Sequence, residues 1–221
     1  MHELRSTLQF RDPGLIAARS GISYLSLAPD HGEFHFLFFG KAVTFTWPNL
    51  TGFNATDDEL SPILQALFLY YLITADGTAV TGKWVSFADL PGGRMYNAAY
   101  QGYSGDEIVK TFGFDLPAFS STCLNIGGTP VEIGSASFVL QALPNLPMLV
   151  TYWLGDEDFP SSCKILFDSS ATHYLPIDGC AIAGSILAGK LRSPKSSNFE
   201  DSRNHSNPTS EDVGVKTNGD L

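Results

Sequence analysis

The sequence predicts an α+β fold, with two largely antiparallel β blocks (hairpins near residues 22–47 and 135–167) packed against helices around a single core. Three observations lead to this class. Apolar and polar residues alternate with a period of two in both blocks. Helical patterns occupy the stretch between them. Strict βαβ alternation is missing, so a doubly wound parallel sheet is not expected.

The first block opens with a short helix over 12–20, because an Asp-Pro pair suits a helix start and a glycine follows the last residue. Gly40-Lys41 lies between two apolar alternating runs and, with glycine first, favours a type II′ hairpin. The expected strands cover 22–28, 33–39 and 42–47.

The clearest helix lies between Asp58 and Ala75, where apolar residues recur at i, i+3, i+4, i+7, i+8, i+11 and i+12. Thr56 and Glu59 have the spacing of a capping box. Pro62 has to lie in the first turn, which favours a start near Asp58.

The rest of the chain carries a helical middle and the second β block. Residues 82–87 are predicted as an ordered connector or a short edge strand, and 90–93 as a turn. The further helices are expected over 95–101, 106–112, 116–126 and 177–191, and the further strands over 136–142, 148–154 and 163–167.

The composition separates a folded body from a tail. Apolar residues make up 43% of the 221 residues, and aromatic residues 12%, which is enough for a packed core. From Ser193 the chain becomes polar, with one Phe, and cannot bury enough apolar surface to offset chain entropy. We therefore expect one domain over 1–192 and a disordered polar tail over 193–221.

The charge excludes several classes of partner. The chain has a net charge of −10, and residues 1–192 hold 10 Lys/Arg against 18 Asp/Glu. Nucleic-acid binding needs a basic stripe, and none occurs here, so neither nucleic acid nor an anionic membrane surface is expected as a partner. Charged residues are sparse at 16%, which is compatible with an apolar surface that meets a partner. The oligomeric state is left open.

The three cysteines, Cys123, Cys163 and Cys180, are far apart and form no Cys-x-x-Cys pair. We interpret them as buried thiols in a reducing cytosol, so the protein is expected to be cytoplasmic. The first residues lack the apolar stretch of a signal peptide, and no apolar run reaches the length of a membrane helix.

Two stretches resemble a known family: VTGKWVSFADLPGGRMYNAAYQGY at 80–103 and TYWLGDEDFPSSCKILFDSSATHYLPID at 151–178. The chain is similar to the uncharacterised family catalogued as domain of unknown function 3786, over roughly 10–192. Members of that family occur in anaerobes and are often fused to a small iron–sulfur domain similar to that of corrinoid iron–sulfur proteins. The resemblance implies a setting in anaerobic corrinoid or one-carbon metabolism, although this chain lacks the four-cysteine module.

The first candidate site surrounds the last predicted strand. Asp168 follows that strand, His173 lies five residues later, and the acidic loop Asp156-Glu157-Asp158 precedes it. Carboxylates and a histidine suit a hard-metal site or an acid–base pair. The strand would hold its two ends about 16 Å apart, which opposes a shared site. The alternatives are a helix N-cap for Asp168, worth about 1 kcal/mol, and a solvated turn for the loop.

The second candidate site is the segment that holds Lys83, Trp84 and Arg94 around the turn at 90–93. Two glycines before a helix can expose N–H groups to an anion, with Lys83 and Arg94 adding charge. Trp and Arg are enriched where binding energy concentrates. We therefore hypothesise one cleft that holds these residues with His173 or Asp168. The alternative is a tight turn, with Trp84 buried and both cations in solvent.

Standard catalytic motifs are missing from the sequence. There is no phosphate-binding loop and no Gly-x-Ser-x-Gly elbow, and the only metal-type spacing of histidines is His31 with His35, so no metal site is predicted. The favoured interpretation is an accessory domain that binds a small molecule, a cofactor or a partner protein. The alternative is a small hydrolase or transferase that uses Asp168 with His173 or the acidic loop. The cofactor is unknown.

Overall fold

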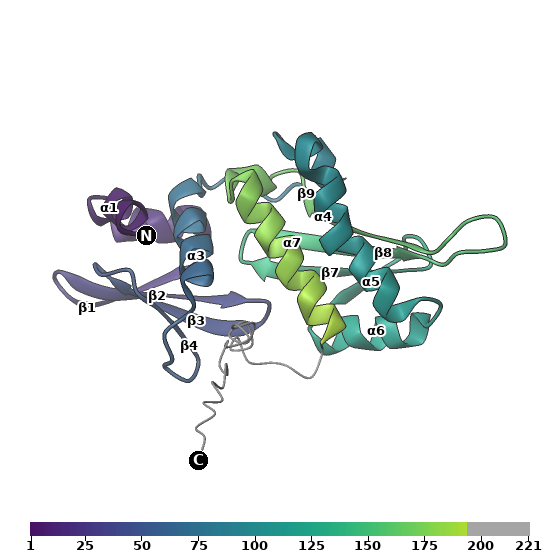
Figure 1. The fold of residues 1–221 in the computed structure, drawn as a ribbon. Coiled ribbons are helices and arrows are strands. Elements are labelled where there is room, and N and C mark those ends of the chain that lie inside the picture. Colours follow the sequence, from purple (N-terminus) through teal and green to yellow (C-terminus); the bar gives the residue numbers. More distant parts are fainter. Residues whose placement is uncertain (194–221) are drawn as a thin grey trace, which may run out of the picture.

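The computed structural model describes residues 1–193. The predicted polar tail, 193–221, therefore lies outside the described residues except for Ser193. In the described part, two antiparallel sheets lie side by side, the first built from the amino-terminal third of the chain and the second from the remainder (Figure 1). This arrangement confirms the predicted α+β class.

The first sheet has four strands in the order β1-β2-β3-β4, and the second has five in the order β5-β9-β8-β7-β6. All neighbouring strands are antiparallel. The strands are β1 (Ser23–Ala28), β2 (His31–Phe38), β3 (Lys41–Trp47), β4 (Gly52–Asn54), β5 (Trp84–Val85), β6 (Thr129–Val131), β7 (Ala136–Leu143), β8 (Leu146–Trp153) and β9 (Ser162–Asp168).

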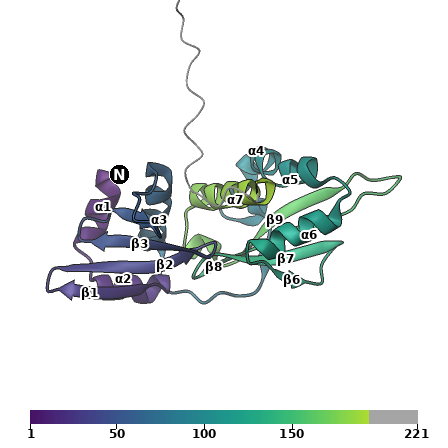
Figure 2. The ribbon, with the colours of Figure 1, turned by 90° about the horizontal axis from the view of Figure 1, so that it is seen from below.

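The helices pack against these sheets. In Figure 1, α1 and α3 lie on one side of the first sheet, and Figure 2 shows α4, α5 and α7 along one face of the second. The α-helices are α1 (His2–Gln9), α2 (Pro13–Ser20), α3 (Pro62–Thr74), α4 (Asn97–Tyr103), α5 (Gly105–Phe112), α6 (Leu116–Asn125) and α7 (Ile177–Arg192). Three short 3₁₀ helices are η1 (Phe87–Asp89), η2 (Gly93–Tyr96) and η3 (Ala171–His173).

One hydrophobic cluster runs through both halves of the described chain. In the first half, the buried ring of Phe68 on α3 meets Phe36, Phe38 and Phe45 edge to face. These three side chains lie on one face of β2 and β3, as the period-two alternation predicted. Continuity of the cluster across the sheets agrees with the predicted single core.

The prediction for the β2–β3 turn was wrong in position and type. The two turn residues are Phe39 and Gly40, at φ of 46° and 74°, and positive φ at both positions is the type I′ pattern. The second half of the molecule holds Phe39 in this unusual place. Its N–H donates to the Ala142 carbonyl at 3.0 Å, and Lys190 Nζ lies 5.6 Å from its ring centroid.

The start of the long helix was also predicted too early. α3 begins at Pro62, and Thr56 does not cap it. The Asn54 side chain instead accepts hydrogen bonds from the backbone N–H groups of Thr56 and Asp58. The backbone of Glu59 pairs with that of Phe53 in an isolated antiparallel β-bridge. Local side-chain hydrogen bonds therefore replace the expected first turn. The sequence also gave no indication of α1, β4 and β6.

Candidate functional site

A segment without helix or strand links the two halves of the molecule. We define the strap as residues Asp76–Gly82, which leave the end of α3 and lead to β5. Three side chains hold the strap: Asp168 of β9, His173 of η3, and Tyr174, which follows η3 directly.

Asp168 anchors the carboxyl end of the strap. Its buried carboxylate accepts five hydrogen bonds from the described residues, which come from N and Oγ1 of Thr81, from N of Gly82, and from N and Oγ of Ser170. The shortest joins Gly82 N and Oδ2 at 2.6 Å. These donors satisfy the carboxylate, so its chemistry here is that of an anchor.

The environment of Asp168 keeps it ionised. Burial by itself would raise the pKa of this carboxyl, but the hydrogen bonds from Ser170 and Thr81 outweigh burial and hold the pKa below its ordinary value. Asp168 also closes an Asx-type turn onto Ser170, ahead of η3, in place of the predicted helix N-cap. An ionised and fully engaged carboxylate is poorly suited to proton transfer or metal binding.

The β5–β9 pair brings two further predicted residues to the same place. Trp84 lies directly opposite Asp168 in the register, and Ser169 N donates to the Lys83 carbonyl at 2.8 Å. Trp84 is half-buried and Lys83 is exposed. The structure therefore places Lys83 and Trp84 beside Asp168 through backbone pairing, and whether they line one cleft stays a prediction.

His173 holds the amino end of the strap through Asp76, which lies 97 residues away in the chain. His173 Nδ1 lies 2.7 Å from Asp76 Oδ2, and Thr78 Oγ1 lies 3.2 Å from the same nitrogen. Because a carboxylate only accepts, Nδ1 carries a proton in this pair. The other carboxylate oxygen, Oδ1, accepts from Thr78 N at 2.9 Å.

The Asp76–His173 pair is accessible to solvent. The side chains are 50% and 48% exposed. The hydrogen bond from His173 is the main reason that the pKa of Asp76 falls to about 2, and hydrogen bonds from Thr78 add to it. The pair therefore presents a permanent carboxylate beside an oriented imidazole, which is an arrangement suited to binding or to proton transfer.

Tyr174 holds the strap at Thr78. Its hydroxyl donates to the Thr78 carbonyl, and its ring stacks on Tyr71 of α3 with centroids 5.8 Å apart. The Tyr71 hydroxyl donates to the Ser20 carbonyl at 2.6 Å and accepts from Asn145 N at 3.1 Å. The strap thus covers a buried contact between the two halves.

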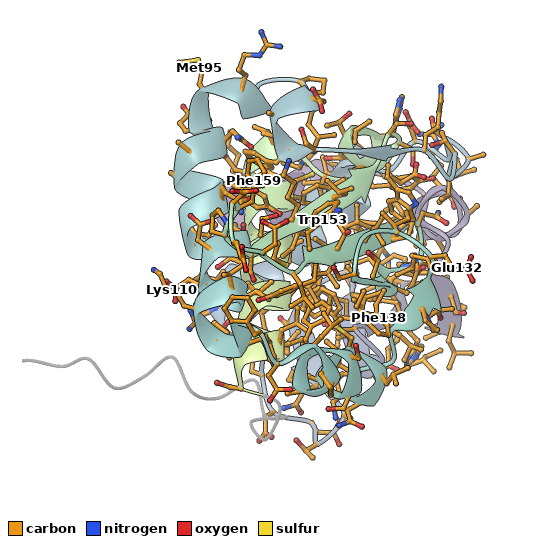
Figure 3. All side chains as sticks on the ribbon, turned by 90° about the vertical axis from the view of Figure 1, so that its right-hand side faces the viewer. Met95, Lys110, Glu132, Phe138, Trp153 and Phe159 are labelled. Atoms are coloured by element: carbon orange, nitrogen blue, oxygen red, sulfur yellow. The ribbon has the colours of Figure 1, made fainter. Side chains whose placement is uncertain are left out.

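Arg94 belongs to η2, which follows the strap and β5 in the chain. It is exposed on η2, and Figure 3 shows the next residue, Met95, pointing outward at the end of this segment. Both glycines before it have structural reasons: a Cβ on Gly93 would lie 1.8 Å from the Phe87 carbonyl oxygen, and Gly92 adopts a positive φ of 81°. This favours the tight-turn interpretation of the segment over an anion site.

The acidic loop lies at the other end of β9 from Asp168. Asp156 Oδ1 accepts from the backbone N–H groups of Asp158 and Phe159, so the loop is closed on itself. The side chains of Asp156 and Asp158 are exposed, as is the nearby Phe159 (Figure 3). These acids do not join Asp168 and His173, because the full length of the strand separates them.

Other candidate groups form no site within the described chain. All three cysteines are free and buried, and burial raises the pKa of the Cys123 thiol to about 12. His31 pairs with Asp30 and His35 with Glu33, so the two histidines do not share a ligand position. Among residues 1–193, no three His, Cys, Asp or Glu side chains come together as metal ligands would.

A family model described as Domain of unknown function (DUF3786) matches residues 12–190. The chain belongs to this family. The match covers the strap and every residue that holds it. No curated protein and no solved structure matches the chain.

The match shows the domain of unknown function alone and does not show a fusion to an iron–sulfur domain. In the part of the family domain that the structure describes, no helix is both long enough and apolar enough to cross a membrane.

The sequence did not indicate four residues that build the site: Asp76, Thr78, Thr81 and Tyr174. Asp76-Gly77-Thr78 has the pattern of an Asx turn, which local reasoning can find. The partner of that turn, His173, lies 97 residues away, so no local pattern reveals the pair.

Proposed function

We propose that this domain is an accessory binding domain for a small molecule, a cofactor or a partner protein. Its binding surface is the exposed side of the strap, formed by Asp76, Thr78 and His173 with Lys83 and Trp84 at its end. One observation carries the proposal: Asp76 and His173 meet from distant parts of the chain and remain half exposed, where a ligand can reach both.

The chemistry of this surface supports recognition. The Asp76 carboxylate offers an acceptor, Thr78 a hydroxyl, and His173 Nε2 an acceptor whose orientation is fixed by the bond at Nδ1. Trp84 adds a half-buried aromatic ring beside the exposed Lys83. A few fixed polar groups beside an aromatic side chain are typical of sites that orient a ligand.

We also propose a metabolic setting for the domain. The resemblance implies anaerobic corrinoid or one-carbon metabolism, and three free buried thiols fit a reducing cytoplasm. A corrinoid and a folate are therefore the first ligands to test.

The test is titration calorimetry of the full chain with cobalamin and, separately, with tetrahydrofolate under anaerobic conditions. We expect one of them to bind, and His173→Ala to weaken binding at least tenfold. His31→Ala is the matched control, because His31 Nδ1 also lies 2.7 Å from an aspartate carboxylate but far from the strap in the chain. If both variants lost affinity equally, the assignment of the binding surface to the strap would be wrong. If neither probe gave binding heat, the proposed corrinoid or one-carbon setting would be wrong.

One observation also supports the alternative, an enzyme of the hydrolase or transferase class. His173 and Asp76 have the arrangement of a general base with its orienting carboxylate. Asp76 would then fill the role that the sequence suggested for Asp168. Hydrolysis of p-nitrophenyl acetate tests this: wild type should exceed His173→Gln and match His31→Gln. Equal rates for wild type and His173→Gln would contradict a basic role.

A further inference from the structure

The strand β1 leaves one edge of the first sheet without a partner. β1 is the outermost strand of that sheet, and among the described strands it pairs with β2 alone (Figure 2). Five of its six residues are exposed, so the preceding helix α2 does not cover it. An unpaired strand edge presents a row of backbone N–H and C=O groups that can pair with another extended chain.

The other outer strands of the described sheets are protected from such pairing. β5 has two residues, and β6 has three, one of which is Pro130. β4 also has three residues, and the bridge between Phe53 and Glu59 covers its outer edge. Short strands and proline are common means by which proteins block pairing at a sheet edge. The six residues of β1 include no proline, and the shift in their register with β2 lies at the end of the strand, after Ser26.

The charge of β1 favours a second copy of this chain as the partner. Residues 20–29 contain no charged side chain, in a chain with a net charge of −10. Two acidic copies repel each other where their surfaces carry charge, so a neutral strand is the place where they can approach. Glu33 of β2 lies opposite Leu25, and His35 Nε2 lies 3.1 Å from its Oε2. If two copies paired through β1, their Glu33 side chains would be about 14 Å apart, beyond the Debye length of about 8 Å at physiological salt.

The strand can also pair with its own copy about a two-fold axis. Facing residues of an antiparallel pair share a face of the sheet, so a symmetric pair has to place one residue opposite itself. With the axis at Leu25, the two Leu25 side chains face each other, and Tyr24 faces Ser26 of the second copy. Leu25 is 52% exposed, and direct apolar contacts across two strands stabilise a sheet.

We propose that two copies of this chain associate through β1, antiparallel about a two-fold axis at Leu25, so that their four-stranded sheets form one continuous sheet. A strand pair of this kind buries less surface than a standard interface of roughly 1,600 Å², so the dissociation constant is expected in the micromolar range. The interface does not involve the strap, and it forms whether or not the strap binds a ligand.

The first experiment is sedimentation velocity of the full chain between about 1 and 500 μM. We expect a monomer that converts to a dimer as the concentration rises. Leu25→Glu places two like charges directly opposite each other at the axis, so it should weaken association at least tenfold. Leu37→Glu is the matched control, because Leu37 of β2 is 56% exposed and the change in net charge is the same. Circular dichroism checks that both variants are folded.

The second experiment tests the register. Leu25→Cys should form a disulfide-linked dimer with copper phenanthroline, since facing residues have Cβ atoms about 5 Å apart. Leu37→Cys should not, because the two Leu37 positions would be about 30 Å apart. The three native cysteines are buried and do not compete.

A chain that stays monomeric over the whole concentration range would overturn the proposal. So would a dimer that Leu25→Glu leaves intact, or one that Leu37→Glu weakens as strongly, since the interface would then lie elsewhere. Equal cross-linking of Leu25→Cys and Leu37→Cys would contradict the two-fold axis at Leu25.

Discussion

At the residue scale, two aspartates hold the two ends of the strap in opposite environments. Asp168 is buried and satisfied by five donors, whereas Asp76 is half exposed and shared between Thr78 and His173. When a buried acceptor is removed, its donors remain without a hydrogen-bond partner, which costs free energy. When an exposed acceptor is removed, its donors can bond to water instead. Asp168 therefore stabilises the fold, and Asp76 is accessible for binding.

Asp168→Ala should destabilise the protein by about 3 kcal/mol, well above the cost of a helix cap alone, because several buried donors lose their charged partner. Urea unfolding of the full chain measures this. Asp158→Ala, in the exposed acidic loop, is the control and should change stability by less than about 0.5 kcal/mol. A similar small effect for Asp168→Ala would contradict the anchor role.

The low pKa of Asp76 predicts how the stability of the protein changes at acid pH. Its pKa in the folded protein is lowered to about 2 from an ordinary value of 3.8, so its contribution to stability is present above pH 4 and is lost as the pH falls towards 2. Carboxyl ¹³C shifts measured by NMR against pH should give a depressed midpoint for Asp76. In His173→Gln the midpoint should rise, since the largest cause of the depression is removed. An unchanged midpoint would show that His173 does not interact with the carboxylate.

At the element scale, contacts from the second half of the molecule override local turn preferences. A phenylalanine at positive φ is rare, yet Phe39 occupies the β2–β3 turn because its buried side chain and its N–H are held by α7 and β7. The strap shows the same principle, since Asp168 and His173 fix a segment that has no regular structure.

Phe39→Gly tests this balance. The substitution relieves the backbone but removes a buried ring, so we expect a net loss of roughly 2 kcal/mol in urea unfolding. The matched control is Asp57→Gly, at φ of 61° on an exposed residue, which should change stability by about 0.5 kcal/mol or less. If Phe39→Gly were neutral or stabilising, the ring would not be an anchor between the halves.

At the scale of the whole molecule, the two sheets share one core and behave as one packing unit. The Phe39–Ala142 hydrogen bond, the Tyr71–Tyr174 stack and the strap all cross between them. The hydrophobic cluster includes residues of both sheets. A shared core of this kind favours a single cooperative unfolding transition.

A chain that ends at Arg192 should keep this transition with an unchanged midpoint. The residues removed are polar in composition and cannot add much apolar burial. Thermal unfolding followed by circular dichroism compares the two chains. Loss of cooperativity on truncation would show that the last residues contribute to the core.

The sequence by itself determined the α+β class and most strands and helices. These features follow from local periodicity and from the pairing of neighbouring strands. Only the tertiary structure decided that Asp168 anchors the strap, that His173 pairs with Asp76, and that Phe39 takes a turn position. Each of these depends on a partner from a distant part of the chain, and a partner at a separation of 97 residues leaves no trace in local pattern.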